Sequence, residues 1–173
     1  MFIGYLVVGL CALGHFGVQA TLSVVFEDII IDVMDPKYFN PADTVATIDE
    51  DDVFSVGFTI TKAIPVRGQG HFTLFGLSMG EYVVPTGLDV EMSLCEMMVE
   101  PIIMGPIFKA LGFSRGTCPV PPGTYKMQRY KLPVENLPDE FEENKYQGTF
   151  EMAVDGKVIM CFRVMTDVTN VYE

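Results

Sequence analysis

Cys95, Cys118, Cys161 and His71 are the residues after position 20 whose side chains are most suited to chemistry. A single histidine cannot form the cluster of imidazole ligands typical of many metal sites. A cysteine nucleophile would need His71 beside Cys161, and nothing in the local spacing suggests that. The 23 acidic residues show no spacing typical of a catalytic carboxylate pair, although their number leaves such a pair open. We therefore expect no metal, no cofactor and no enzymatic activity.

The N-terminal segment resembles an export signal. The first twenty residues, MFIGYLVVGLCALGHFGVQA, contain no Asp, Glu, Lys or Arg. An apolar stretch over 3–13 followed by Val18-Gln19-Ala20 is typical of a cleaved signal peptide, whereas a membrane anchor would need about 20 apolar residues. We expect cleavage after residue 20, a mature domain over 21–173 that is secreted and extracellular, and no stable membrane insertion.

Export determines what is expected of the cysteines. An oxidising compartment favours a disulfide among the three cysteines of the mature chain. Because three is an odd number, one thiol stays free or pairs with another chain. The sequence leaves the oligomeric state open for the same reason.

Charge and composition narrow the range of partners. A formal net charge of -12 argues against nucleic acid and against anionic membranes, both of which need a basic face. The chain is 49% hydrophobic, with 11 Met, 13 Phe and no Trp. Many Met and Phe residues can form an adaptable apolar wall, but an ordinary filled core has the same composition.

The dominant hydrophobic period is two. Alternation of apolar and polar residues predicts strands over 22–33, 54–60, 72–79, 88–94 and 123–132. Residues 150–154 and 158–164 flank Asp155-Gly156, which predicts a hairpin because both central positions of a type I′ turn need positive φ. Asp35-Pro36 and Asn40-Pro41 indicate loops. About seven or eight strands predict an all-β, antiparallel two-sheet β-sandwich, with a barrel as the other arrangement.

The longest irregular segment is CEMMVEPIIMGPIFKALGFSRGTCPVPPG, residues 95–123. Pro101 and Pro106 forbid one continuous helix, so we expect one short helix over 107–111 that ends at Gly112. A broken, Met-rich apolar segment can repack around different ligands. The alternative is that it fills one end of the sandwich as core.

The segment also carries a family resemblance. The sequence LDVEMSLC over 88–95, then GTCP over 116–119 and PPGTY over 121–125, resembles insect secreted proteins related to the ganglioside activator protein. These include the chemosensory B-type proteins, which are similar in turn to ML lipid-recognition domains. The resemblance implies an immunoglobulin-like, ML-type cup that holds a lipid between two sheets. It also implies a Cys95–Cys118 disulfide, which would stabilise the fold by about 3 kcal/mol. We interpret this bond as a staple that pins a flap at the mouth of the cup, and a plain structural cross-link is the compatible alternative.

The resemblance has limits. Members commonly carry further cysteine pairs that this chain lacks, and Cys161 has no partner that the pattern can name. Activation of a glycosidase is therefore not implied. We expect Cys161 to be a mostly buried, unreactive thiol.

Two groups of residues are candidates for ligand contact. The helical flap between the cysteines contributes Met97, Met98, Ile103, Met104, Ile107, Phe108, Leu111 and Phe113. The strands contribute Phe58, Met92, Tyr125, Met152, Met160 and Phe162, with Phe54, Val56, Ile60, Leu88, Val90, Phe150 and Val164 as further wall residues. Tyr125, Lys109 and Arg115 are candidate polar donors at the rim.

These observations predict a secreted protein that binds a lipid or another apolar small molecule. Chemosensation, pheromone detection and lipid transport are the roles that the resemblance implies. The alternative is a structural or interaction protein with a filled core, acting through acidic residues 49–52 and 139–143. The sequence does not name the ligand, the tissue or any receptor protein.

Overall fold

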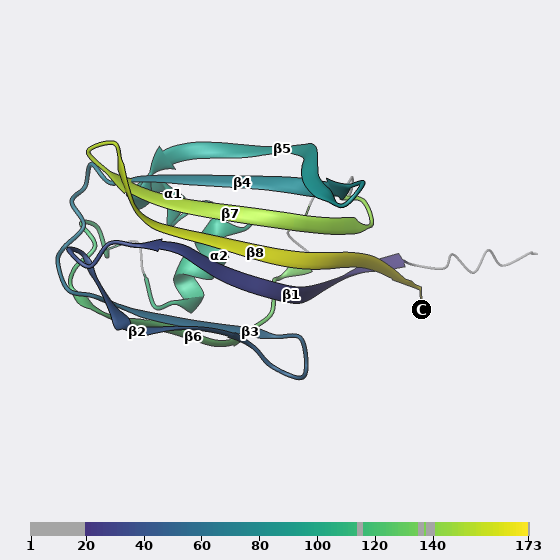
Figure 1. Ribbon diagram of the computed structural model, residues 1–173, viewed down its shortest axis with the longest axis horizontal. Coiled ribbons are helices and arrows are strands. Elements are labelled where there is room, and N and C mark those ends of the chain that lie inside the picture. Colours follow the sequence, from purple (N-terminus) through teal and green to yellow (C-terminus); the bar gives the residue numbers. More distant parts are fainter. Residues whose placement is uncertain (1–19, 114–115, 135–136, 138–140, 173) are drawn as a thin grey trace, which may run out of the picture.

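The computed structural model describes residues 20–113, 116–134, 137 and 141–172. Most of the expected signal peptide, residues 1–19, therefore lies outside the described residues. The described elements follow one another in a single order (Figure 1): β1 (Ala20–Met34), β2 (Phe39–Ile48), β3 (Phe54–Ile60), β4 (Gln69–Ser78), β5 (Glu81–Ser93), α1 (Leu94–Met97), α2 (Met104–Ala110), β6 (Gly123–Tyr130), β7 (Asn144–Val154) and β8 (Lys157–Tyr172).

The strands form two sheets that face each other. One sheet has the order β1-β8-β7-β4-β5 and the other β2-β3-β6, and every neighbouring pair is antiparallel. The two helices connect β5 to β6 and lie between the layers (Figure 1). The fold is thus the expected all-β antiparallel two-sheet sandwich, with two short helices in place of the one that the sequence predicted.

The β7–β8 hairpin confirms the clearest local prediction. Asp155 and Gly156 have φ values of 53° and 75°, so both central turn residues adopt the positive φ that a type I′ turn requires. The ladder continues beyond the turn, with Phe150 opposite Phe162 and Met152 opposite Met160. The inward face of this hairpin is consequently an apolar surface that lies opposite the second sheet.

Strand β1 departs from simple alternation. Its pairing with β8 shifts between Phe26 and Asp28, and the amide of Ile29 donates to Asp28 Oδ1 at 2.8 Å. Because a bulge reverses the parity of the side chains that follow it, Phe26 and Ile29 both face the interior. Strict alternation over the predicted strand 22–33 would place Phe26 and Ile29 on opposite faces, so the alternation does not hold through the bulge.

Prolines lie in edge strands of both sheets, and one of them, Pro41, belongs to a dipeptide that predicted a loop. Asn40-Pro41 lies inside β2, at an irregularity of its pairing with β3. Pro85 lies inside β5, which pairs only with β4. Proline is tolerated on an edge strand because one side of that strand donates no ladder hydrogen bonds. The loop predicted at Asn40-Pro41 is thus replaced by strand.

The helical segment is organised by two carboxylates. Ser93 and Glu96 form a reciprocal capping box at the start of α1. The Glu100 carboxylate accepts from the backbone amides of residues 102, 103 and 104, at 2.7, 2.9 and 2.8 Å. Helix α2 therefore begins at Met104, earlier than predicted, and the left-handed Gly112 (φ 95°) follows its end.

Candidate ligand-binding cavity

An apolar cavity of about 130 Å³ lies between the sheets. Its wall is formed by residues from all the elements except β2, β5 and α1, namely Val24, Phe26, Ile29, Phe54, Val56, Phe58, Phe72, Leu74, Ile103, Met104, Ile107, Phe108, Leu111, Met127, Leu132, Leu137, Phe141, Tyr146, Gly148, Phe150, Met160, Phe162, Val164, Thr166 and Val168. No charged side chain is among these described lining residues. Engineered cavities of similar size and apolarity remain dry and bind small hydrocarbons.

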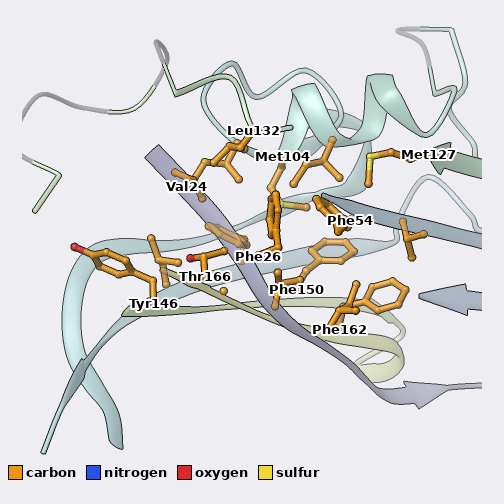
Figure 2. A pocket seen from close by; sticks show the side chains of 18 of the residues that line it. Val24, Phe26, Phe54, Met104, Met127, Leu132, Tyr146, Phe150, Phe162 and Thr166 are labelled. Carbon is orange, nitrogen blue, oxygen red and sulfur yellow. The ribbon is translucent and has the colours of Figure 1, made fainter. Parts of the chain in front are cut away.

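The cavity extends towards one end of the sandwich. Val24, Leu132, Tyr146 and Thr166 lie at this end of the wall, and Met127 and Phe162 lie towards the other (Figure 2). Val24, Leu132 and Thr166 are only half-buried, as is Phe141. We call these four residues the half-buried end of the cavity.

The opposite end of the sandwich has a densely packed core. Its core residues, the filled end, are Ile60, Ile64, Leu94, Met97, Val120 and Met152, each no more than 1% exposed. Gly70 on β4 makes room there, since a Cβ atom at this position would lie 2.6 Å from Met97 Sδ. The side chains at this end are therefore closely packed, next to the β7–β8 hairpin at the left of Figure 1.

The Cys95–Cys118 disulfide is formed, with its Cα atoms 5.8 Å apart. It joins α1 to the segment that leads into β6, beside the main-chain hydrogen bonds that link Ile64 and Val120. The disulfide therefore fastens the filled end of the sandwich and not the half-buried end, although the sequence led us to expect the bond at the mouth of a cup.

The predicted contact residues divide between the two regions. Those that line the cavity are Phe58, Ile103, Met104, Ile107, Phe108, Leu111, Met160 and Phe162. Those that do not line it are Met92, Met97, Met98, Phe113, Tyr125 and Met152. Met97 and Met152 belong to the filled end, and the rings of Phe113 and Tyr125 stack on each other with centroids 4.1 Å apart. Met98 is buried at the end of α1, and Met92 lies half-buried on β5.

The residues at the half-buried end of the cavity were not predicted from the sequence to contact a ligand. Leu132, Leu137 and Phe141 come from the connection between β6 and β7, which has no periodicity to mark an inward face. Val24, Phe26 and Ile29 belong to the strand predicted over 22–33, but the bulge after Phe26 concealed that Ile29 shares the inward face of the other two. Thr166 and Val168 continue the inward alternation of β8 beyond the predicted end of that strand, so extending the pattern would have found them.

The candidate rim donors lie elsewhere. The Tyr125 hydroxyl donates to the Pro121 carbonyl at 2.9 Å, and Lys109 is exposed on α2. Arg115 is outside the described residues. The lining residues that carry a hydroxyl are Thr166 and Tyr146, and the Tyr146 hydroxyl already donates to the Glu142 carbonyl at 2.7 Å.

Comparisons with known proteins add one structural likeness. No protein-family model matches the chain, and a search of curated proteins finds no match. The chain is similar to the crystal structure of a Niemann-Pick type C2 protein from Japanese carpenter ant. That match has 16% sequence identity and a TM-score of 0.32, and it covers 87% of this chain and 93% of that chain. The two-sheet sandwich is defined by the observed strand pairing.

No helix among the described residues is long and apolar enough to cross a membrane. The same part of the chain contains no group of three or more His, Cys, Asp or Glu side chains placed to hold a metal ion.

The two tyrosines of β6 offer a matched test of how polar groups are buried. Burial raises the pKa of Tyr130 to about 12, and no described residue hydrogen-bonds to its buried hydroxyl. Burial also raises the pKa of Tyr125, whose hydroxyl is satisfied by Pro121.

We expect Tyr130→Phe to increase the free energy of unfolding by up to about 1 kcal/mol, because it removes an unsatisfied buried donor. The control Tyr125→Phe should decrease that free energy by about 1 kcal/mol through loss of a hydrogen bond. Urea titration of both variants measures the difference. A Tyr130→Phe variant that is less stable than the wild type would contradict this account of the hydroxyl.

The outer face of the larger sheet brings together residues that no local spacing connects. His71 on β4 and Cys161 on β8 both pair with Glu151 on β7, which lies between them. Burial and the carboxylates of Glu151 and Asp32 raise the pKa of the Cys161 thiol. A nucleophilic cysteine needs the opposite shift, so this arrangement holds a buried, protonated thiol, as the sequence led us to expect.

His71 is a satisfied surface histidine that carries a pH dependence. Its Nε2 lies 2.7 Å from Asp89 Oδ1 and its Nδ1 lies 3.8 Å from Glu151 Oε2. The hydrogen bond to Asp89 raises the pKa of His71 above its ordinary 6.5, desolvation opposes that rise, and the charges of Asp89, Glu151 and Glu91 add to it. The folded protein therefore binds this proton more tightly than the unfolded chain does.

We expect His71→Gln to remove a stabilisation that is fully present below about pH 6.5 and is lost as the pH rises through the raised pKa of His71. Thermal unfolding of wild type and variant across neutral pH measures this. The difference in Tm should be largest on the acid side and should disappear on the alkaline side. A difference that does not vary with pH would show that the ionic contacts contribute nothing.

Proposed function

We propose that this protein is a secreted binding protein that holds a lipid or another apolar small molecule between its two β-sheets. The observation that carries the proposal is the cavity of about 130 Å³, whose described lining has no charged side chain. A chain that needed only a stable core would gain by filling this space, since each unfilled volume loses packing contacts. The filled end shows that this sequence can pack densely.

The chemistry of the wall indicates which part of a ligand goes where. Transfer of apolar ligand surface from water is favourable by about 25 cal/mol per Å², so the aromatic and aliphatic wall supplies the affinity. The hydroxyls of Thr166 and Tyr146 are the polar side-chain groups of the described wall. We infer that the ligand enters at the half-buried end and leaves its polar head group there.

The family resemblance supports the same proposal. Insect secreted proteins related to the ganglioside activator and ML domains would use such a cavity for lipids, and a secreted location agrees with the disulfide and with the expected signal peptide. Lipid transport and chemosensation, including pheromone detection, are the roles that we propose for the bound ligand.

The interaction-protein alternative is less well supported. Its acidic turn is partly neutralised, because Arg129 forms ion pairs with both Asp49 and Asp51. Residues 139 and 140 of its second acidic stretch lie outside the described residues.

Titration of the mature protein with 11-(dansylamino)undecanoic acid tests the proposal. We expect saturable binding of one probe per chain, a blue shift of the dansyl emission, and displacement by oleic acid. Emission that rises without saturation, or that oleic acid does not reverse, would contradict a binding function.

A further inference from the structure

A second, smaller cavity of about 30 Å³ lies beside the first. It is lined by Phe72, Leu88, Val90, Met97, Glu100, Ile102, Ile103 and Met104. Phe72, Ile103 and Met104 also line the main cavity. These three side chains therefore form a partition between two spaces that share a wall.

The partition combines a fixed backbone with one flexible side chain. Glu100 accepts hydrogen bonds from the amides of both Ile103 and Met104. Gly105 packs so tightly that a Cβ atom there would lie 2.0 Å from the Glu100 carbonyl oxygen. The main chain at this point is thus held on two sides and cannot withdraw without breaking these contacts.

Met104 is the member of the partition that can move. Its side chain is 5% exposed, projects from the first residue of α2, and lies among the aromatic rings of the cavity (Figure 2). An unbranched thioether has three rotatable bonds and packs in several rotamers at little cost. The β-branched Ile103 and the ring of Phe72 are stiffer. A rotamer change of Met104 alone can consequently join the two cavities.

We propose that the small cavity is a subsite for the distal end of a long unbranched alkyl or acyl chain, and that Met104 sets the chain length that the protein accepts. This inference rests on the proposed binding function. With Met104 in its observed position, the ligand chain ends in the main cavity. When Met104 turns aside, the chain continues beneath β5 towards Leu88 and Val90.

The carboxylate of Glu100 is compatible with an apolar ligand group in the small cavity. Glu100 already accepts three backbone hydrogen bonds, so its charge is stabilised by the start of α2 and needs no ligand group. The remaining wall of the subsite is aliphatic, aromatic or thioether. The ligand end that fits it is a methyl terminus and not a second head group.

Chain-length profiles of designed variants test the subsite. Saturated fatty acids from octanoic to stearic acid are used to displace the dansyl probe from wild type and from Met104→Ala. We expect Met104→Ala to improve the affinity for the longest acids by about tenfold relative to the shortest, since deleting the partition admits additional methylene groups at about 0.8 kcal/mol each.

Two further substitutions separate this mechanism from a general enlargement of the site. Val90 lines only the small cavity, so adding Val90→Phe to Met104→Ala should abolish the gain for long acids. Met127 lines only the main cavity, so Met127→Ala makes the matched deletion elsewhere, and Val90→Phe should not change its profile. Leu88→Phe serves as a second blocking variant, and far-UV circular dichroism establishes that each variant is folded.

The possible outcomes distinguish failure of the proposed subsite from failure of the proposed binding function. If the wild type binds the probe but Met104→Ala gives the same profile as Met127→Ala, or if blocking at both Val90 and Leu88 leaves the long-chain gain intact, the subsite is overturned and the binding function stands. If the wild type does not bind the probe at all, the proposed function fails and the subsite fails with it.

Discussion

Replacing Val164 by Phe is expected to abolish uptake of an apolar ligand while leaving the protein at least as stable as the wild type. Val164 faces the main cavity from β8 and pairs with Gly148 on β7, which has no side chain to occupy the neighbouring space. A phenyl ring at this position would enter the cavity. Filling an existing cavity commonly stabilises a protein by about 0.5–2 kcal/mol, whereas the ligand loses the volume that it needs.

Probe titration and thermal unfolding together measure this prediction. We expect the affinity of Val164→Phe for the dansyl probe to fall at least tenfold, with a Tm equal to or above that of the wild type. The control Val45→Phe makes the same change on β2, where the side chain is 54% exposed and lies outside the cavity. It should leave the affinity unchanged. Equal probe binding by the wild type and by Val164→Phe would show that the probe does not occupy this cavity.

Removal of the disulfide should have the largest effect on stability. Cys95 and Cys118 enclose a loop with a sequence separation of 23 residues. In the chain-entropy model, a cross-link over a loop of this length stabilises the fold by about 3 kcal/mol. We expect the double variant Cys95→Ser/Cys118→Ser to lose this amount and its Tm to fall by roughly 6–12 °C.

The position of the disulfide makes the prediction more specific. Because the bond fastens the filled end and not the half-buried end, the double variant should still bind the probe with an affinity near that of the wild type when both are folded. The control Cys161→Ser removes a cysteine that is free in the structure, so it should cost clearly less stability. Free-thiol titration of the unfolded mature protein should find one thiol per chain. A double variant as stable as Cys161→Ser would contradict the proposed role of the bond.

Local signals in the sequence were sufficient for much of the fold. The positive φ demanded at Asp155 and Gly156 is a property of two residues, so the hairpin could be predicted without knowledge of any distant contact. The alternation from Phe54 to Ile60 likewise depends only on which face of β3 is buried. The Cys95–Cys118 pairing came from the family resemblance, and the structure confirms it.

The features that escaped prediction depend on contacts between distant segments. The bulge that turns both Phe26 and Ile29 inward is defined by pairing with β8, more than a hundred residues away in sequence. The position of the disulfide at the filled end depends on how Met97 packs against Gly70. Local hydrophobic periodicity in the sequence predicts neither the bulge in β1 nor the position of the disulfide.

The residues that line the cavity likewise divide into those that local sequence signals predict and those that they do not. Phe58, Met160 and Phe162 were predictable because regular strands alternate. Phe108 was predictable from the expected short helix over 107–111, and Met104 from the apolar, Met-rich segment between the two cysteines. Residues such as Leu132 and Phe141 belong to an irregular connection whose inward side is set only when the two sheets meet. The half-buried end of the cavity could therefore be located only from the structure.

Native mass spectrometry of the mature protein, secreted from eukaryotic cells and sprayed without exposure to organic solvent, tests the central claim most directly. We expect a chain that carries a noncovalent adduct with the mass of one lipid, which is released by organic solvent and is absent from Val164→Phe. A wild-type chain that has only its own mass, and that gains no adduct after incubation with fatty acids, would contradict the claim that the space between the sheets is a binding site.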